Sequence, residues 1–297
     1  MPIYRIEELV YGVDDLDRSA KFFLDAGFNG LTTTTFSTAV NQIVSLKPAN
    51  DPSLPPATES GPTLRELVWG VETAADIDVL AERLGDAAKL DGDTLRTIDP
   101  NGLGIGFRVM DVAETPLHER PANQVMHRNR INERLESYIQ PPALRMVHVA
   151  YNIEKAKNEE ALAFYRDVLN FKEVDKVLDT GTFLQSEADI EHHNFFLCFR
   201  PDRVGLNHVA LEMWNFDAVM EAGDHMVSQG WKESRRPGRH KLGSNVYRFV
   251  HAPSGGRLEF VADMDRMDKT WETRIFEKNP GHNLWMLKSS GPQKEEA

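Results

Sequence analysis

One pattern occurs four times in this sequence, and this repetition constrains the fold more than any other feature. Strand-like segments with alternating apolar residues begin at Glu7, Arg65, Val147 and Asn207, and each precedes a segment with apolar residues at helical spacing. Short strand candidates follow, separated by turn signals such as the Pro-Ser-Gly-Gly of residues 253–256. The repeated unit is therefore one strand, one helix and then several strands.

Paired units predict two domains. We expect the first in residues 1–112 and the second in residues 144–265, joined by a polar linker, residues 113–143, with prolines near both of its ends. Residues 266–297 form a C-terminal tail. This tail carries large apolar side chains, which predict that it packs on the body of the protein: Trp271, Phe276 and Trp285.

Length and charge narrow the possible functions. The 297 residues, of which 41% are hydrophobic, are enough to bury a substantial core. The formal net charge of −12, from 46 acidic and 34 basic residues, opposes binding to nucleic acid and to anionic membranes. With no membrane-spanning apolar run and no leader evident, we expect a cytoplasmic protein that acts on a small molecule. The single cysteine, Cys198, excludes an intramolecular disulfide and fits a buried position.

In the second domain, three potential metal ligands fall at equivalent positions of the repeats. His148 and His208 occupy the same position in two strands, and Glu259 follows the turn residue Pro253 by six positions. A lone histidine is more often structural. Two imidazoles and a carboxylate from three strands, however, form the facial ligand set typical of non-haem Fe(II), which leaves coordination positions open.

The first domain has no matching set. Its equivalent positions carry Glu8, Glu66 and Gly106, so the third ligand is missing. A relic site or a second metal site is an alternative, but a structural or solvent-exposed role fits these glutamates better. Two other histidines, His225 in a helical segment and His251 in a turn, are expected to have no role in function.

With these positions in register, the chain resembles the vicinal oxygen chelate superfamily, and within it the two-domain extradiol ring-cleaving dioxygenases. The resemblance rests on VHVAY, LNHVALEM and GGRLEF, which carry His148, His208 and Glu259. It implies an α+β fold of two domains, each made of paired βαβββ modules, with a curved, incompletely closed mixed sheet around the metal site. It also implies that the three residues bind Fe(II), with Mn(II) as the alternative, in a homo-oligomer.

Two further histidines match the same enzymes. His193 of EHHNFFLCF is implied to donate a hydrogen bond, and then a proton, to reduced oxygen. His240 of PGRHKLG is implied to bind or deprotonate a substrate hydroxyl. We expect the neighbouring His192 to lie on the opposite strand face, at the surface.

Aromatic side chains predict a cavity wall for a ring-shaped substrate. These are Phe195, Tyr247 and Phe249, although core packing is the alternative for any of them. Phe249 stands where many ring-cleaving relatives have a tyrosine that contacts the catecholate, and Tyr247, two residues away on the same strand face, is its substitute. The implied reaction is cleavage of a catecholic ring by O2, with a small aromatic diol as substrate.

Two alternatives belong to other functional classes. A metal-dependent isomerase, epimerase or lyase of the same superfamily would use the metal as a Lewis acid and need no O2. Many of these enzymes take a fourth ligand from the strand that here has the sequence NFFLCFRP, which contains no carboxylate, so the dioxygenase is preferred. The other alternative is a binding protein with an inactive site, against which His193 and His240 argue.

Overall fold

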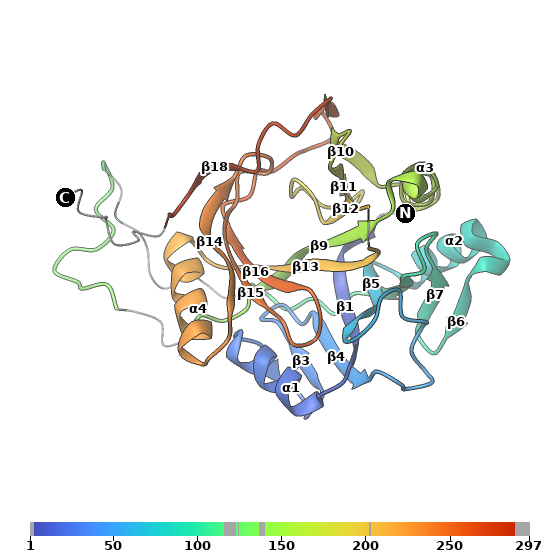
Figure 1. The fold of residues 1–297 in the computed structure, drawn as a ribbon, viewed down its shortest axis with the longest axis horizontal. Coiled ribbons are helices and arrows are strands. Elements are labelled where there is room, and N and C mark those ends of the chain that lie inside the picture. The colour runs from blue at the N-terminus through green and yellow to red at the C-terminus, as the bar shows by residue number, and fades with distance from the viewer. Residues whose placement is uncertain (1–2, 116–122, 124, 137–139, 202, 289–297) are drawn as a thin grey trace, which may run out of the picture.

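The strands of this computed structural model form two large mixed sheets (Figure 1). It describes residues 3–115, 123, 125–136, 140–201 and 203–288. The first sheet has the strand order β2-β3-β4-β1-β5-β8-β7-β6, and the second has the order β17-β10-β11-β12-β9-β13-β16-β15-β14-β18. The second sheet curves around an interior without closing on itself (Figure 1). The predicted α+β class of two domains with curved mixed sheets is confirmed.

The first sheet draws all its strands from the first part of the chain. They are β1 (Ile3–Val13), β2 (Asn29–Gly30), β3 (Thr35–Ser37), β4 (Ile43–Pro48), β5 (Thr63–Val71), β6 (Lys89–Asp91), β7 (Thr94–Ile98) and β8 (Gly104–Val109). Its helices are α1 (Leu16–Asp25) and α2 (Ala74–Leu84), followed by a short 3-10 helix, Gly85–Ala87. Thr73 and Asp76 form a capping box that fixes where α2 begins.

The second sheet uses the later part of the chain. Its strands are β9 (Arg145–Ile153), β10 (Lys172–Val177), β11 (Gly181–Gln185), β12 (Phe195–Phe199), β13 (Gly205–Glu212), β14 (Glu233–His240), β15 (Val246–His251), β16 (Arg257–Ala262), β17 (Arg274–Phe276) and β18 (Asn283–Met286). The helices are a 3-10 turn (Lys155–Lys157), α3 (Asn158–Leu162), a π-helix (Ala163–Val168) and α4 (Phe216–Ser228). Within the described residues, no helix has the length and apolar character needed to cross a membrane.

The pairing of the central strands repeats from one sheet to the other. In the antiparallel pair of β9 and β13, His148 lies opposite Ala210. In the matching pair of β1 and β5, Glu8 lies opposite Val68. His148 and Glu8 therefore occupy equivalent positions, as the sequence repeat predicts.

The parallel pairs beside them repeat as well. Ala210 of β13 lies opposite Glu259 of β16, and Val68 of β5 lies opposite Gly106 of β8. Gly106 is thus the structural equivalent of Glu259. Because side chains alternate along a strand, this shared register puts the equivalent positions on the same face of each sheet.

Buried contacts join the two sheets into one core. The side-chain amide of Gln42, 0% exposed, donates to the backbone oxygens of Ile6 and Met146 and accepts from the backbone N–H of Met146. The Tyr165 hydroxyl donates to a buried carboxylate oxygen of Asp99, 2.9 Å away. These hydrogen bonds fix how the second sheet sits on the first.

The C-terminal tail packs on the second sheet at both of its edges. Strand β17 pairs with β10, and β18 pairs with β14, at the opposite edge. Residues 277–282 therefore cross from one edge of the open sheet to the other (Figure 1).

Candidate metal centre

Three side chains from neighbouring strands converge inside the second sheet. Nε2 of His148 lies 3.1 Å from Nε2 of His208 and 3.0 Å from Oε2 of Glu259, and Nε2 of His208 lies 3.3 Å from the same oxygen. Among the described residues, they form the one group of His, Cys, Asp and Glu with ligand atoms close enough to hold a metal ion, all within 4.8 Å of one another.

The triangle of donor atoms has the size that a divalent metal requires. Ligand bonds of about 2.1 Å at right angles place neighbouring donors about 3.0 Å apart. The three sides measured here are 3.0, 3.1 and 3.3 Å. The three side chains thus resemble one face of an octahedral site.

The protonation states of these groups also suit a cation. Burial lowers the pKa of His208 to about 4, and its Nδ1 lies 2.9 Å from Oδ1 of Asn207. The neutral ring therefore carries its proton on Nδ1 and directs its Nε2 lone pair toward Glu259. Glu259 is fully buried, and its Oε2 atom faces the Nε2 atoms of both His148 and His208. A lone pair facing a carboxylate is repulsive, and a metal ion between them removes the repulsion.

His193 lies beside this group, just before β12. Its ring centroid is 4.3 Å from that of His148, and its side chain lines the adjoining cavity. Burial, together with the neighbouring rings of His148 and His192, lowers the pKa of His193 well below its usual value. The ring is therefore neutral near pH 7 and is able either to donate or to accept a proton.

His192 is buried, and the expectation that it lies at the surface is wrong. Its exposed fraction is 0%, its Nδ1 lies 3.0 Å from Nδ1 of His193, and its Nε2 lies 3.0 Å from Oδ2 of Asp175. Asp175 is in turn paired with Arg274, whose Nη2 is 2.6 Å away. The alternation of a regular strand does not apply here, because the chain bends at residues 192 and 194, before β12 begins.

His240, at the end of β14, reaches the other side of the group. Its Nε2 lies 3.2 Å from Oε1 of Glu259, and its ring stacks on that of Tyr247 with centroids 4.1 Å apart. The Tyr247 hydroxyl donates to Oδ1 of Asn283, 2.7 Å away, on the tail strand β18. The expected contact of Tyr247 with a substrate is therefore wrong, since this tyrosine supports His240 from behind and does not line the cavity.

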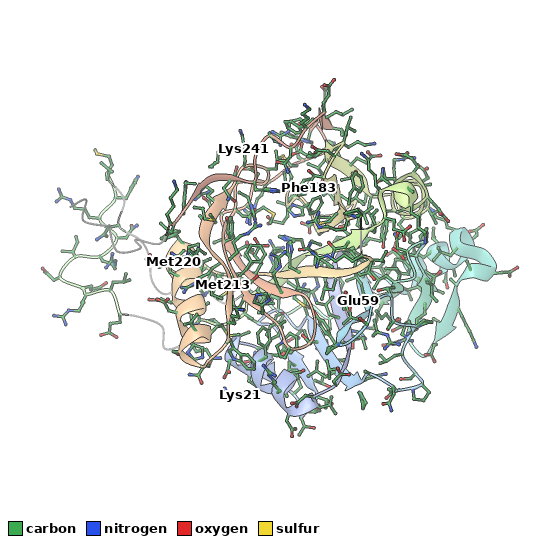
Figure 2. All side chains as sticks on the ribbon, viewed as in Figure 1. Lys21, Glu59, Phe183, Met213, Met220 and Lys241 are labelled. Atoms are coloured by element: carbon green, nitrogen blue, oxygen red, sulfur yellow. The ribbon has the colours of Figure 1, made fainter. Side chains whose placement is uncertain are left out.

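A cavity of about 110 Å³ adjoins the three candidate ligands. Phe183, Phe196 and Phe249 form much of its apolar wall, and the first two stack with centroids 3.9 Å apart. Phe183 lies on the inner side of the curved sheet (Figure 2). Cys198 also lines the cavity, and burial raises the pKa of its thiol to about 12, so it is a poor nucleophile.

Phe195 faces away from this cavity, and its predicted role in substrate binding is wrong. Its ring packs in the core, with centroids 4.7 Å from Tyr165 and 6.1 Å from Trp69. Side chains alternate along β12, so Phe196 takes the inward position. Phe249 does line the cavity, with its ring centroid 5.2 Å from that of His208.

Comparison with known proteins agrees with this arrangement. Residues 145–260 match the family described as the Glyoxalase/Bleomycin resistance protein/Dioxygenase superfamily. We call these matched residues the superfamily region. The superfamily region includes all three candidate ligands, together with His193 and His240.

Curated relatives of the superfamily region include a metapyrocatechase and biphenyl-2,3-diol 1,2-dioxygenases. Metapyrocatechase 2 of Cupriavidus necator is 32% identical over 107 residues, which cover 36% of this chain and 33% of the relative. Biphenyl-2,3-diol 1,2-dioxygenase of Paraburkholderia xenovorans (strain LB400) is 27% identical over 138 residues, covering 44% of this chain and 45% of the relative. The chain thus spans between a third and a half of the length of these relatives.

Solved structures share the fold of nearly the whole chain. A Mn(II)-bound glyoxalase from Novosphingobium aromaticivorans has a TM-score of 0.75 at 20% identity, covering 98% of this chain and 93% of its own. BphC, a halotolerant catechol dioxygenase, has a TM-score of 0.72 at 15% identity, with coverages of 98% and 96%. The fold shared with these structures therefore extends through both sheets.

Outside the superfamily region, the equivalent positions of the first sheet carry ion pairs. Oε2 of Glu8 lies 2.8 Å from Nη1 of Arg108, and Oε1 of Glu66 lies 2.9 Å from Nε of Arg96. Burial raises the pKa of Glu66. Both carboxylates have arginine partners, which favours the structural role over a second metal site.

Proposed function

We propose that the protein is a non-haem Fe(II)-dependent dioxygenase of the extradiol type, which cleaves a catecholic ring with O2. The observation that carries the proposal is the facial group of two histidines and one glutamate at the wall of a cavity that also presents His193 and His240. The cavity, about 110 Å³, is comparable with an engineered cavity of about 150 Å³ that holds benzene. The names of the curated relatives support the same chemistry.

His148, His208 and Glu259 would hold the metal, with Mn(II) as the alternative to Fe(II). When bound, Fe(II) supplies open coordination positions for the two diol oxygens and for O2, together with a path for electrons between them, so that no external reductant is needed. Asn207 keeps the ring of His208 in the tautomer that directs a lone pair inward.

The aromatic wall would hold the substrate ring in place. Phe183 and Phe196 present one apolar surface and Phe249 another, so a flat ring between them is desolvated and oriented. The carboxylate of Glu259 and the ring of His240 then lie beside the hydroxyl groups.

His240 would accept a proton from a substrate hydroxyl. Its Nδ1 lies 3.2 Å from the backbone oxygen of His282, which is able only to accept a hydrogen bond. Nε2 also faces an acceptor, Oε1 of Glu259, 3.2 Å away. With this carboxylate bound to the metal, a neutral ring would keep its proton on Nδ1 and would present the Nε2 lone pair to the substrate hydroxyl.

His193 would move a second proton on the other side of the cavity. The Asp175 carboxylate accepts from Nε2 of His192, so Nδ1 of His192 in turn accepts from Nδ1 of His193 when both rings are neutral. This leaves Nε2 of His193 to take up a proton and later return it to the product.

Oxygen consumption tests the proposal directly. The protein would be purified without oxygen, loaded with Fe(II) and assayed on a panel of catechols with an oxygen electrode and by absorbance. We expect O2 uptake to equal product formation, and a yellow ring-opened product to form without added reductant. Turnover that continues unchanged in anaerobic buffer would overturn the proposal in favour of a Lewis-acid isomerase or lyase.

The same proposal includes the domain boundaries, residues 1–112 and 144–265, and a homo-oligomeric state. Light scattering of the purified protein tests the oligomeric state, and limited proteolysis tests the linker at residues 113–143.

A further inference from the structure

The cavity beside the candidate metal centre carries an excess of positive charge. Arg200, Arg235 and Arg257 line it, whereas the described residues contribute one carboxylate, that of Glu259. Within the described part of the chain, none of these three arginines forms an ion pair with an acidic side chain. A metal-bound diol accounts for Glu259 but not for three arginines.

Arg257 is the best defined of the three. It follows the turn into β16, two residues before Glu259, so both side chains lie on the same strand face. It donates to Oδ1 of Asn207, and its guanidinium carbon lies 4.9 Å from the ring centroid of Phe249. Burial, together with the nearby Arg235, lowers the pKa of Arg257. A guanidinium nevertheless stays charged, and a largely buried charge without a counter-ion costs free energy.

Arg235 approaches the same ring from the neighbouring strands. It lies opposite Phe249 in the pairing of β14 with β15, and its guanidinium carbon is 5.5 Å from the Phe249 ring centroid. Arg200 follows β12 and donates to the backbone oxygen of Phe199, 2.8 Å away. Two guanidinium groups against one phenyl ring repel each other unless an anion lies between them.

Arg235, Arg257 and His240 surround the ring of Phe249. The two guanidinium carbons lie 5.5 and 4.9 Å from its centroid, and the centroid of the His240 ring lies 6.3 Å from it. Arg257 is two residues from Glu259, roughly 7 Å along β16. One aromatic ring is able to span the gap between the candidate metal centre and the arginines.

We propose that the substrate is a single-ring diol that carries a carboxylate substituent, and that Arg257 and Arg235, with Arg200 nearby, bind this carboxylate. The inference rests on the proposed function and specifies its substrate class. A guanidinium group forms two parallel hydrogen bonds with a carboxylate, which gives both charge and orientation. This subsite would exclude neutral diols that leave the arginines without a partner.

Binding of compounds that cannot be cleaved tests the subsite without turnover. Calorimetry would compare 4-hydroxyphenylacetate with the neutral 4-ethylphenol on the metal-loaded protein under anaerobic conditions. We expect the anion to bind at least about ten-fold more tightly, as for a charge pair shielded from water. This preference should disappear in Arg257→Met and weaken in Arg235→Met, whereas Arg257→Lys should recover part of it.

The matched control is Arg236→Met, since Arg236 is exposed on the same strand and does not line the cavity. It should keep the full preference. Equal affinities for the two compounds, or a preference that survives in both Arg257→Met and Arg235→Met, would overturn the proposal. Metal analysis of each variant shows whether a loss of binding comes from a loss of the metal.

A turnover experiment separates this inference from the proposed function. kcat/KM would be compared for 3,4-dihydroxyphenylacetate and 4-methylcatechol. A ratio above about ten that falls in Arg257→Met supports both ideas. Cleavage of both diols at equal rates would overturn the carboxylate subsite but leave the dioxygenase standing. No oxygen uptake with any diol, together with anion-selective binding, would overturn the dioxygenase but leave the subsite standing.

Discussion

The two sheets share one strand register but differ at three equivalent positions. In the second sheet these positions carry His148, His208 and Glu259, whose donor atoms face one another. In the first sheet they carry two carboxylates and a glycine, and each carboxylate is paired with an arginine. The backbone geometry thus does not by itself make a metal site, and the charges placed on it decide between a ligand group and a salt bridge.

The difference extends to the neighbouring strand. Arg96 of β7 lies opposite Gly106, whereas Phe249 of β15 lies opposite Glu259. Phe249 and Arg96 therefore occupy equivalent positions. Phe249 lines the cavity in the second sheet, whereas Arg96 pairs with Glu66 in the first. A Cβ atom at Gly106 would lie 3.0 Å from a Val68 methyl carbon, so this position has little room for a carboxylate ligand.

The largest effect is expected when the candidate ligands, and their equivalents in the first sheet, are replaced by alanine one at a time. His208→Ala or Glu259→Ala should reduce bound Fe(II) from about one ion per chain to near zero and abolish ring cleavage, because two donors do not hold the ion tightly. Glu8→Ala and Glu66→Ala are the matched variants in the first sheet and should keep the metal. Metal content would be measured by mass spectrometry, and full occupancy in His208→Ala would refute the assignment.

A second test concerns His193. Its equivalent in the first sheet is Gln42, the residue just before β4. His193→Phe should keep the metal but lose roughly 10²-fold in turnover, the usual size of a lost acid-base contribution. The exposed His251 provides the control, and His251→Phe should be fully active. Loss of metal in His193→Phe would make this residue a ligand, and unchanged turnover would reduce it to a packing role.

A third test asks what Gln42 does in the first sheet. Its buried amide bonds the backbones of Ile6 and Met146, so Gln42→Ala leaves these groups unpaired. We expect the free energy of unfolding to fall by about 2 kcal/mol in urea denaturation. The exposed Gln229 is the control, and Gln229→Ala should change stability by less than about 0.5 kcal/mol. An equal effect of both changes would show that Gln42 does not join the sheets.

The smallest expected effect concerns Glu66 and pH. Because burial raises the pKa of Glu66 in the folded protein above its unfolded value, the ionised carboxylate opposes folding above this pKa. The cost disappears as pH falls toward the usual pKa of 4.5. From pH 7 to pH 5, the wild type should therefore gain stability relative to Glu66→Gln, by less than the effect of Gln42→Ala. Thermal unfolding at both pH values measures the difference, and a pH-independent difference would contradict the assignment.

The sequence predicts the repeats and the ligand positions because both depend on local alternation. Period-two alternation fixes which face of a strand each residue occupies, and the repeat fixes the register of His148, His208 and Glu259. The same parity fails by one residue in β12, where Phe196 and not Phe195 faces the cavity. An error of one position places a side chain on the opposite face of the strand. A strand in which no second residue fixes the register is therefore easily assigned the wrong face.

Other features depend on contacts that are distant in the sequence. His192 is buried because it pairs with Asp175, which lies 17 residues away. Asp175 in turn pairs with Arg274, which lies 99 residues away from it. The Tyr247 hydroxyl donates a hydrogen bond to Asn283 of the tail, 36 residues away. Phe196, Cys198 and Arg200 alternate along the chain, and this spacing predicts that Arg200 faces the cavity if Phe196 does. The sequence does not show which of the arginines lack a carboxylate partner.

The path of the tail has a consequence for how the protein is made. The ribosome releases the three candidate ligands before residues 274–286, which form β17 and β18. Asn279 and His282, between these two strands, line the cavity, so its wall is complete only when the tail has paired with both edges of the sheet.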